Sequence, residues 1–200
     1  MHPWRDRLAR WFTPLARGFP LSPNAITIVA LILNLIAASL LYTRHFLLGM
    51  VFIAIAGLAD AFDGIVARVQ NKSTRFGDFL DHFCDRVSDA AIGVTWMMGS
   101  GVGFGLTAIA MIVVMLNGYV GTQIEASFGQ RSYEGVGRGE FVLALIAFPI
   151  VSYVLLQNGL LATRFSGFTI PGWLTIAMTA FALFGIAQRV ARAARLDEPR

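Results

Sequence analysis

Apolar residues dominate the chain in six long stretches that short polar segments separate. A helix that crosses a membrane needs about 20 mostly apolar residues, and each stretch is about that long. The expected spans are residues 25–43, 47–66, 79–98, 102–124, 140–158 and 169–188. The pattern predicts an all-α polytopic membrane protein with six transmembrane helices.

The residues before the first stretch have a different pattern. Four apolar side chains recur at helical spacing, and arginines occupy the other faces, as in an amphipathic helix in the membrane interface. They are Trp4, Leu8, Trp11 and Leu15. A disordered basic tail is the alternative, and Pro14 would bend or end a helix here. We therefore expect a cytoplasmic or interfacial segment, 1–22, followed by one transmembrane domain, 23–200.

Composition and charge agree with a membrane protein. Hydrophobic residues make up 56% of the chain, charged residues 14%, and the mean hydropathy is +0.64. Thirteen basic residues lie in the two termini and the second and fourth connections, whereas only Arg44 and Arg164 lie in the others. Basic residues accumulate on the cytoplasmic side, so both termini are expected there. Anionic lipid headgroups explain the net charge of +4 better than nucleic acid does.

Four aspartates interrupt the apolar pattern. A charged side chain at the membrane centre costs roughly 2.5–3.5 kcal/mol and usually marks a functional path. Asp60 and Asp63 share one helical face near the cytoplasmic end of the second span, and Asp81 and Asp85 share one face at the start of the third. An antiparallel pair of these helices is expected to bring all four carboxylates together just inside the cytoplasmic surface.

Such a cluster requires compensating positive charge. An all-carboxylate site favours Mg²⁺ or Mn²⁺, and two such ions could share the four aspartates. The alternative is that some of the aspartates pair with Arg68 or Arg86. Gly64 and Gly77 let backbone approach a ligand closely, and Arg68 lies one turn beyond Gly64, where it could meet a phosphate. The residues together indicate a diphosphate site.

The run from residue 60 to residue 85 resembles the signature of the CDP-alcohol phosphotransferase family. Its eight fixed positions are all present: Asp60, Asp63, Gly64, Ala67, Arg68, Gly77, Asp81 and Asp85. The resemblance implies that a phosphatidyl or similar group moves from a CDP-linked lipid, such as CDP-diacylglycerol, to a small polar alcohol, with release of CMP. It also implies a homodimer in a prokaryotic-type cytoplasmic membrane, with the active site on the cytoplasmic face.

The resemblance also assigns roles to individual residues. Metal binding falls to Asp60, Asp63, Asp81 and Asp85, and Asp85 is in addition the candidate catalytic base. The cytidine diphosphate pocket would contain Asp60, Gly64, Ala67, Arg68 and Gly77. Ser73 and Thr74 lie in the loop near Gly77, where binding to phosphate and simple solvation are both open.

The acceptor is less well defined. Family members that use inositol phosphate carry basic residues near the end of the fourth span and again before the fifth. Residues 119–126 have no arginine in the first region, whereas Arg131 and Arg138 lie near the second. The missing arginines weaken the case for a phosphorylated acceptor and leave serine, a neutral polyol or an unusual alcohol open. Gln123, Glu125, Arg131 and Arg138 are candidates to line the acceptor site.

Several nearby polar residues are given structural roles. We expect Asn24 to cap the first span and Asp78 the third. His82 lies about 100° around the helix from Asp81 and is expected to point elsewhere. Cys84 is expected to pack inside its helix.

Two other functional classes use similar residues. A cation transporter also carries intramembrane carboxylates, but nearer the bilayer centre and often in internal repeats, which this chain lacks. A Mg²⁺-dependent prenyltransferase normally has a second aspartate-rich motif, whereas residues 101–200 contain only five acidic residues, which are scattered. Both predict no CMP release from a CDP-lipid.

Overall fold

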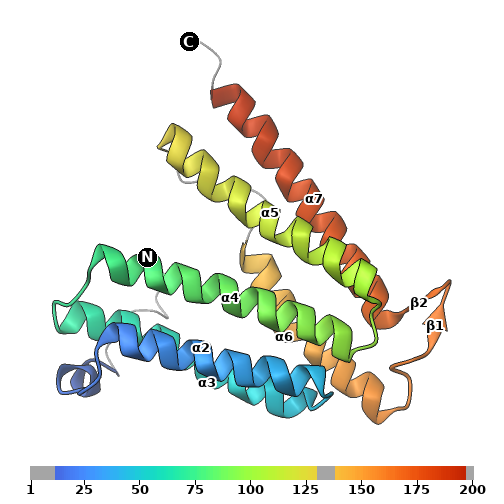
Figure 1. Ribbon diagram of the computed structural model, residues 1–200, viewed down its shortest axis with the longest axis horizontal. Helices are drawn as coiled ribbons and strands as arrows, with labels where there is room; N and C mark the ends of the chain where they lie inside the picture. Colours follow the sequence, from blue (N-terminus) through green and yellow to red (C-terminus); the bar gives the residue numbers. More distant parts are fainter. Residues whose placement is uncertain (1–11, 130–137, 197–200) are drawn as a thin grey trace.

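The computed structural model describes residues 12–129 and 138–196 and is built almost entirely of helices (Figure 1). A short helical segment covers residues 12–17. The long helices are α2 (Pro23–Tyr42), α3 (Phe46–Val69), α4 (Arg75–Gly99), α5 (Phe104–Phe128), α6 (Arg138–Gln157) and α7 (Ile170–Leu196). Each expected span coincides with one of these helices.

The helices form two groups that diverge from each other (Figure 1). In the first group α2 packs extensively against both α3 and α4, and in the second α5 runs beside α7. Helix α6 joins the groups through contacts with α3, α4 and α7. Helices α3 and α4 of the first group carry the aspartates.

Both helices that lead into the aspartate region begin with a hydroxyl cap. The Ser22 hydroxyl accepts a hydrogen bond from the Ala25 amide at 3.3 Å, and the Thr74 hydroxyl accepts one from the Gly77 amide at 3.0 Å. The expected caps, Asn24 and Asp78, were therefore wrong, because each lies inside the first turn of its helix. A residue with extended backbone just before the helix can turn its side-chain hydroxyl toward the free amides of the first turn. A residue already within the helix cannot reach them as well.

The main core lies at the other end of the bundle. Trp96 is fully enclosed, and its indole Nε1 donates to the Ser152 hydroxyl of α6 at 2.9 Å. Ser152 is also within 2.9 Å of the Ser100 hydroxyl. This buried network joins α4 to α6. A packed core therefore anchors α4 at the end away from its aspartates.

Among the residues that the structure describes, four helices are long and apolar enough to cross a membrane: α2, α3, α5 and α7. Helix α4 is long enough, but its aspartates lower its mean hydropathy, and the apolar stretch described within α6 is Leu143–Gln157. The coarse prediction of a helical membrane protein therefore agrees with the structure. Of the expected interfacial helix, Trp4, Leu8 and Trp11 lie outside the described residues.

The last connection contains a feature that the apolar pattern did not predict. Strands β1 (Arg164–Phe165) and β2 (Phe168–Thr169) pair in antiparallel fashion between α6 and α7. Ser166 and Gly167 both have positive φ, at 49° and 89°, as a tight two-residue hairpin requires.

Candidate metal and nucleotide site

The aspartates of α3 and α4 converge at the end of the bundle where the two helices are connected. One carboxylate oxygen from each of Asp60, Asp63 and Asp81 lies within 4.8 Å of the others. Ligand atoms of Asp81, His82 and Asp85 form a second group of the same size. Asp81 belongs to both groups, so it links the two pairs of aspartates.

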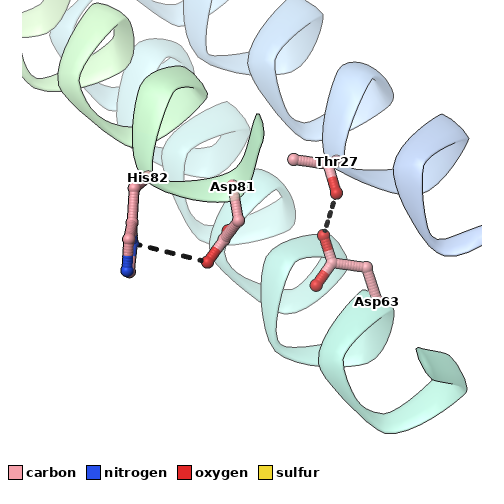
Figure 2. Close-up of polar contacts among 4 residues, drawn as sticks. All are labelled: Thr27, Asp63, Asp81 and His82. Atoms are coloured by element: carbon pink, nitrogen blue, oxygen red, sulfur yellow. Dashed lines mark hydrogen bonds and ion pairs between the residues drawn. The ribbon is translucent and has the colours of Figure 1, made fainter. Parts of the chain in front are cut away.

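Helix α2 holds this arrangement together. The expectation was a direct antiparallel pair of α3 and α4, but most backbone contacts of both helices are with α2. The Thr27 hydroxyl of α2 donates to Asp63 Oδ2 at 2.6 Å, and this bond is buried (Figure 2). Pro23, Asn24 and Thr27 resemble the family's usual opening of the first span, but nothing in the sequence assigned Thr27 a role at the aspartates, and its contact with Asp63 is known from the structure.

The charges around the aspartates favour a cation from outside the chain. Asp63 is 8% exposed, and among residues 12–129 and 138–196 neither Asp60 nor Asp63 has an arginine or lysine within ion-pair distance. The two arginines proposed as alternative partners bond elsewhere. Arg68 Nε donates to the Gly64 carbonyl at 2.9 Å, and Arg86 Nη1 lies 3.9 Å from Asp89 Oδ2. Clustered carboxylates of which two have no arginine or lysine partner among the described residues suit a divalent ion with oxygen ligands.

His82 lies closer to the cluster than its position on the helix suggested. Its Nδ1 is 3.9 Å from Asp81 Oδ2, and Figure 2 shows the two side chains extending from α4 on the same side. The side chain of His82 is 75% exposed. The expectation that it points away was wrong, because a long side chain spans the 100° that separates neighbouring positions.

The connection between α3 and α4 packs against the start of α2. A Cβ atom added to Gly77 would lie 3.2 Å from both Asn24 Oδ1 and Thr74 Oγ1. The close approach expected at Gly77 is thus made by α2 and by the cap of α4. A Cβ atom added to Gly64 would lie 4.0 Å from its nearest neighbour, the Arg68 guanidinium. A ligand therefore has room to approach the backbone there. Ser73 is exposed in this connection, and Arg68 is exposed in the last turn of α3.

A cavity of about 1070 Å³ opens between α4, α5, α6 and α7. On α4 it is lined by His82 and Arg86, which flank Asp85 in sequence, and on α7 by Arg189. Glu125 lines this cavity, whereas Gln123 does not. Arg131 lies outside the described residues, and of Arg138 the structure describes only that its backbone begins α6.

The two arginines of this cavity pack against two glycines of α5. A Cβ atom at Gly118 would lie 2.9 Å from Arg86 Nη1, and one at Gly121 would lie 3.2 Å from Arg189 Nη1. Arg189 is only 8% exposed, and its Nη1 also donates to Asn117 Oδ1 at 2.9 Å. The glycines are three residues apart, on one face of α5. Two guanidinium groups from different helices therefore lie on a single glycine face in the cavity wall.

Comparison with known proteins identifies the class of this chain. The family model described as CDP-alcohol phosphatidyltransferase matches residues 20–184. The chain belongs to the CDP-alcohol phosphatidyltransferase family, whose members transfer a phosphatidyl or related group from a CDP-linked donor to an alcohol. Membership rules out the cation transporter and the aspartate-rich prenyltransferase as readings of the carboxylates.

The chain is similar to several characterised proteins in sequence or in structure. The phosphatidylinositol phosphate synthase of Mycobacteroides abscessus is 32% identical over 161 residues, which cover 74% of this chain and 72% of that protein. The archaetidylinositol phosphate synthase of Pyrococcus horikoshii is 27% identical over an alignment that covers 80% of this chain and 82% of that protein. A crystal structure of Mycobacterium tuberculosis phosphatidylinositol phosphate synthase with CDP-DAG bound aligns with a TM-score of 0.69 and 26% identity, over 94% of each chain. Another, in complex with manganese and citrate, has a TM-score of 0.73 at 22% identity, over 94% of this chain and 92% of that one, and so supports the fold.

Proposed function

We propose that this protein transfers a phosphatidyl group from CDP-diacylglycerol or a similar CDP-lipid to a phosphorylated polyol of the inositol phosphate type. The observation that carries the proposal is the convergence of Asp60, Asp63 and Asp81 within 4.8 Å, with Asp85 one turn beyond Asp81. The relatives are synthases of phosphatidylinositol phosphate and archaetidylinositol phosphate, and together with the donor bound to the structural relative they supply the substrate classes.

The four aspartates hold two divalent ions, Mg²⁺ or Mn²⁺. Asp60, Asp63 and Asp81 bind one, and Asp81 and Asp85 bind the other. When bound, these ions neutralise the diphosphate and stabilise the departing CMP. The manganese in a structural relative agrees with this choice of metal. Thr27 fixes the carboxylate orientation of Asp63, which preorganises the site before substrate arrives.

The connection between α3 and α4 receives the cytidine diphosphate. Gly64 leaves space for a ligand beside the backbone, and Arg68 is exposed one turn further, where its guanidinium contacts a phosphate. The remaining members of the proposed pocket are Asp60, Ala67, Ser73, Thr74 and Gly77. Asp85 removes the proton of the acceptor hydroxyl, because an alcohol is a poor nucleophile at neutral pH.

The acceptor enters through the cavity between α4 and α7. The structure offers Arg86 and Arg189 there, and they supply positive charge that residues 119–126 lack. A phosphorylated acceptor is therefore favoured over serine or a neutral polyol, because guanidinium groups recognise phosphate with paired hydrogen bonds. Arg131 and Arg138 are proposed to complete the basic wall, and Gln123 to act at its edge.

All six long helices span the membrane, with the aspartates near the cytoplasmic face and both termini in the cytoplasm. The distribution of basic residues supports this orientation. Residues 1–22 lie in the interface, and the protein acts as a homodimer by family resemblance. The low mean hydropathy of α4 is compatible with a membrane span that lines the substrate sites, because its charged face borders these sites rather than lipid.

Acceptor competition tests the proposal. Purified protein would be incubated with CDP-diacylglycerol, Mn²⁺ and equal concentrations of inositol 1-phosphate, inositol, glycerol 3-phosphate and serine, and the lipid products separated by mass. We expect the inositol phosphate product to dominate. Predominance of the inositol or serine product would overturn the acceptor assignment and leave the donor chemistry intact.

A further inference from the structure

The end of the bundle away from the aspartates has an unusual charge pattern. It contains the connections after α2, α4 and α6, which cover residues 43–45, 100–103 and 158–169. These connections hold two arginines, Arg44 and Arg164, and none of the twelve acidic residues of the chain. Any counterion for the two arginines must therefore come from outside these connections.

The two arginines line the same small pocket. Its volume is about 280 Å³, and its other lining residues include Ser100, Gly101 and Thr169. Arg44 comes from the α2–α3 connection and Arg164 from the hairpin before α7, so residues 120 positions apart in the sequence meet here. The hydroxyls of Ser100 and Thr169 are already bonded within the protein, to Ser152 and to the Gly172 amide, so the two arginines supply the groups free to bind a ligand.

Arg44 is held in place rather than free to extend into water. Its backbone has φ of 65°, which is uncommon for a residue other than glycine, and its Nε donates to the Gly99 carbonyl at 3.0 Å. Within residues 12–129 and 138–196, the terminal nitrogens of Arg44 and the guanidinium of Arg164 have no hydrogen-bond or ion-pair partner. One side of each guanidinium is thus available to a ligand.

The hairpin beside the pocket has the character of a membrane interface. Phe165 is 75% exposed, and the Trp173 indole Nε1 donates to its carbonyl at 2.9 Å. Phe168 packs edge to face on Trp173, with ring centroids 5.4 Å apart. Aromatic side chains of this kind concentrate at the depth of the lipid headgroups. The arginines of the pocket therefore lie at the level where lipid phosphates are found.

We propose that Arg44 and Arg164 form a binding site for the phosphate group of a lipid in the leaflet opposite the aspartate site. Guanidinium groups bind phosphate with paired, charge-assisted hydrogen bonds, and two converging cations without a carboxylate select an anion. The exposed aromatic hairpin favours a lipid over free phosphate, because it places apolar rings beside the acyl region. The site is separate from the catalytic cavity, since the two share no lining residue.

Titration with phospholipid tests this site. The purified, delipidated protein would be titrated with phosphatidylglycerol in detergent, and bound lipids counted by native mass spectrometry. The double variant Arg44→Gln/Arg164→Gln should bind its tightest lipid about 25-fold more weakly, since each arginine near a phosphate surface contributes about fivefold, equivalent to about 1 kcal/mol. Arg195→Gln, an exposed arginine in the last turn of α7, should behave like the unmodified protein.

Two further arms make the result decisive. Arg164→Gln alone, which breaks no hydrogen bond among the described residues, should weaken binding about fivefold and leave the melting temperature and CMP release unchanged. Inorganic phosphate at the same concentration should not displace the lipid. Equal lipid binding by Arg164→Gln and the unmodified protein, an equal loss in Arg195→Gln, or displacement by inorganic phosphate would each overturn the proposal.

Discussion

The Thr27 hydroxyl donates a 2.6 Å hydrogen bond to Asp63 Oδ2, joining α2 to the aspartate cluster. Thr27 is 5% exposed and Asp63 is 8% exposed, so water does not replace this bond. The same hydroxyl lies 3.1 Å from the Pro23 carbonyl. A helix that contributes no aspartate therefore sets the orientation of one.

Replacement of Thr27 by valine should impair metal use more than folding. Valine has nearly the same shape but no hydroxyl, and a hydrogen bond to a charged group is worth roughly 1.5–3 kcal/mol. We expect the Mn²⁺ concentration for half-maximal CMP release to rise about tenfold or more. Thr27→Ser should restore most of the difference.

A matched control for this variant is available in α4. Within the described part of the chain, the Thr95 hydroxyl bonds only to backbone carbonyls of its own helix, at 2.7 and 3.3 Å. Thr95→Val should leave the Mn²⁺ dependence unchanged. A similar rise in both variants would show that loss of any helix hydroxyl, rather than the orientation of Asp63, causes the effect.

Divalent metal should stabilise the folded protein through Asp81. A ligand that binds only the native state raises the free energy of unfolding as its concentration exceeds its dissociation constant. Addition of Mn²⁺ should therefore raise the melting temperature of the unmodified protein, and EDTA should reverse the rise. Asp81→Asn should abolish the response, whereas Asp78→Asn, an exposed aspartate in the same helix, should keep it. A full Mn²⁺ response in Asp81→Asn would contradict the shared role of Asp81.

Gly118→Ala should weaken acceptor binding without unfolding the protein. The added methyl group would lie 2.9 Å from the end of the flexible Arg86 side chain, which has to move away. We expect KM for the acceptor to rise several-fold while the melting temperature changes little. Gly105→Ala, on the same helix with open space around it, is the control and should change neither quantity. An unchanged KM in Gly118→Ala would separate Arg86 from acceptor binding.

Thr74 can be tested as a cap and as a phosphate ligand separately. Thr74→Ala removes the acceptor for the Gly77 amide, and loss of a cap costs about 0.5–2 kcal/mol, so the melting temperature should fall. Thr74→Asp keeps a cap but places negative charge beside the proposed diphosphate. The aspartate variant should retain stability and raise KM for the CDP-lipid. Unchanged KM in this variant would leave Thr74 with the capping role alone.

The sequence predicted the helices and the aspartate cluster because both depend on local spacing. The lengths of apolar stretches located the helices, and intervals of three and four residues put Asp60 with Asp63 and Asp81 with Asp85. Asp81 belongs to both groups of ligand atoms, and this could not be predicted from the sequence. It depends on how α3 and α4 are placed relative to each other, which spacing within one helix does not determine.

Contacts between distant residues were not predictable in the same way. Thr27 and Asp63 are 36 positions apart, and Arg189 and Asn117 are 72 apart, so only the packing of helices brings them together. The hairpin at Ser166 and Gly167 was missed for a different reason. Its strands have two residues each, too short to alter the apolar pattern that located the spans.

Metal-dependent release of CMP tests the central claim most directly. Purified protein would be supplied with CDP-diacylglycerol and inositol 1-phosphate, with and without Mn²⁺, and CMP and the lipid product measured together. We predict equal amounts of CMP and phosphorylated inositol lipid, no release without metal or without acceptor, and a loss of at least a hundredfold in Asp81→Asn, because an interaction of about 3 kcal/mol with the reacting groups is removed. CMP release that persists without divalent metal, or that Asp81→Asn leaves intact, would contradict the assignment of the aspartate cluster as the catalytic centre.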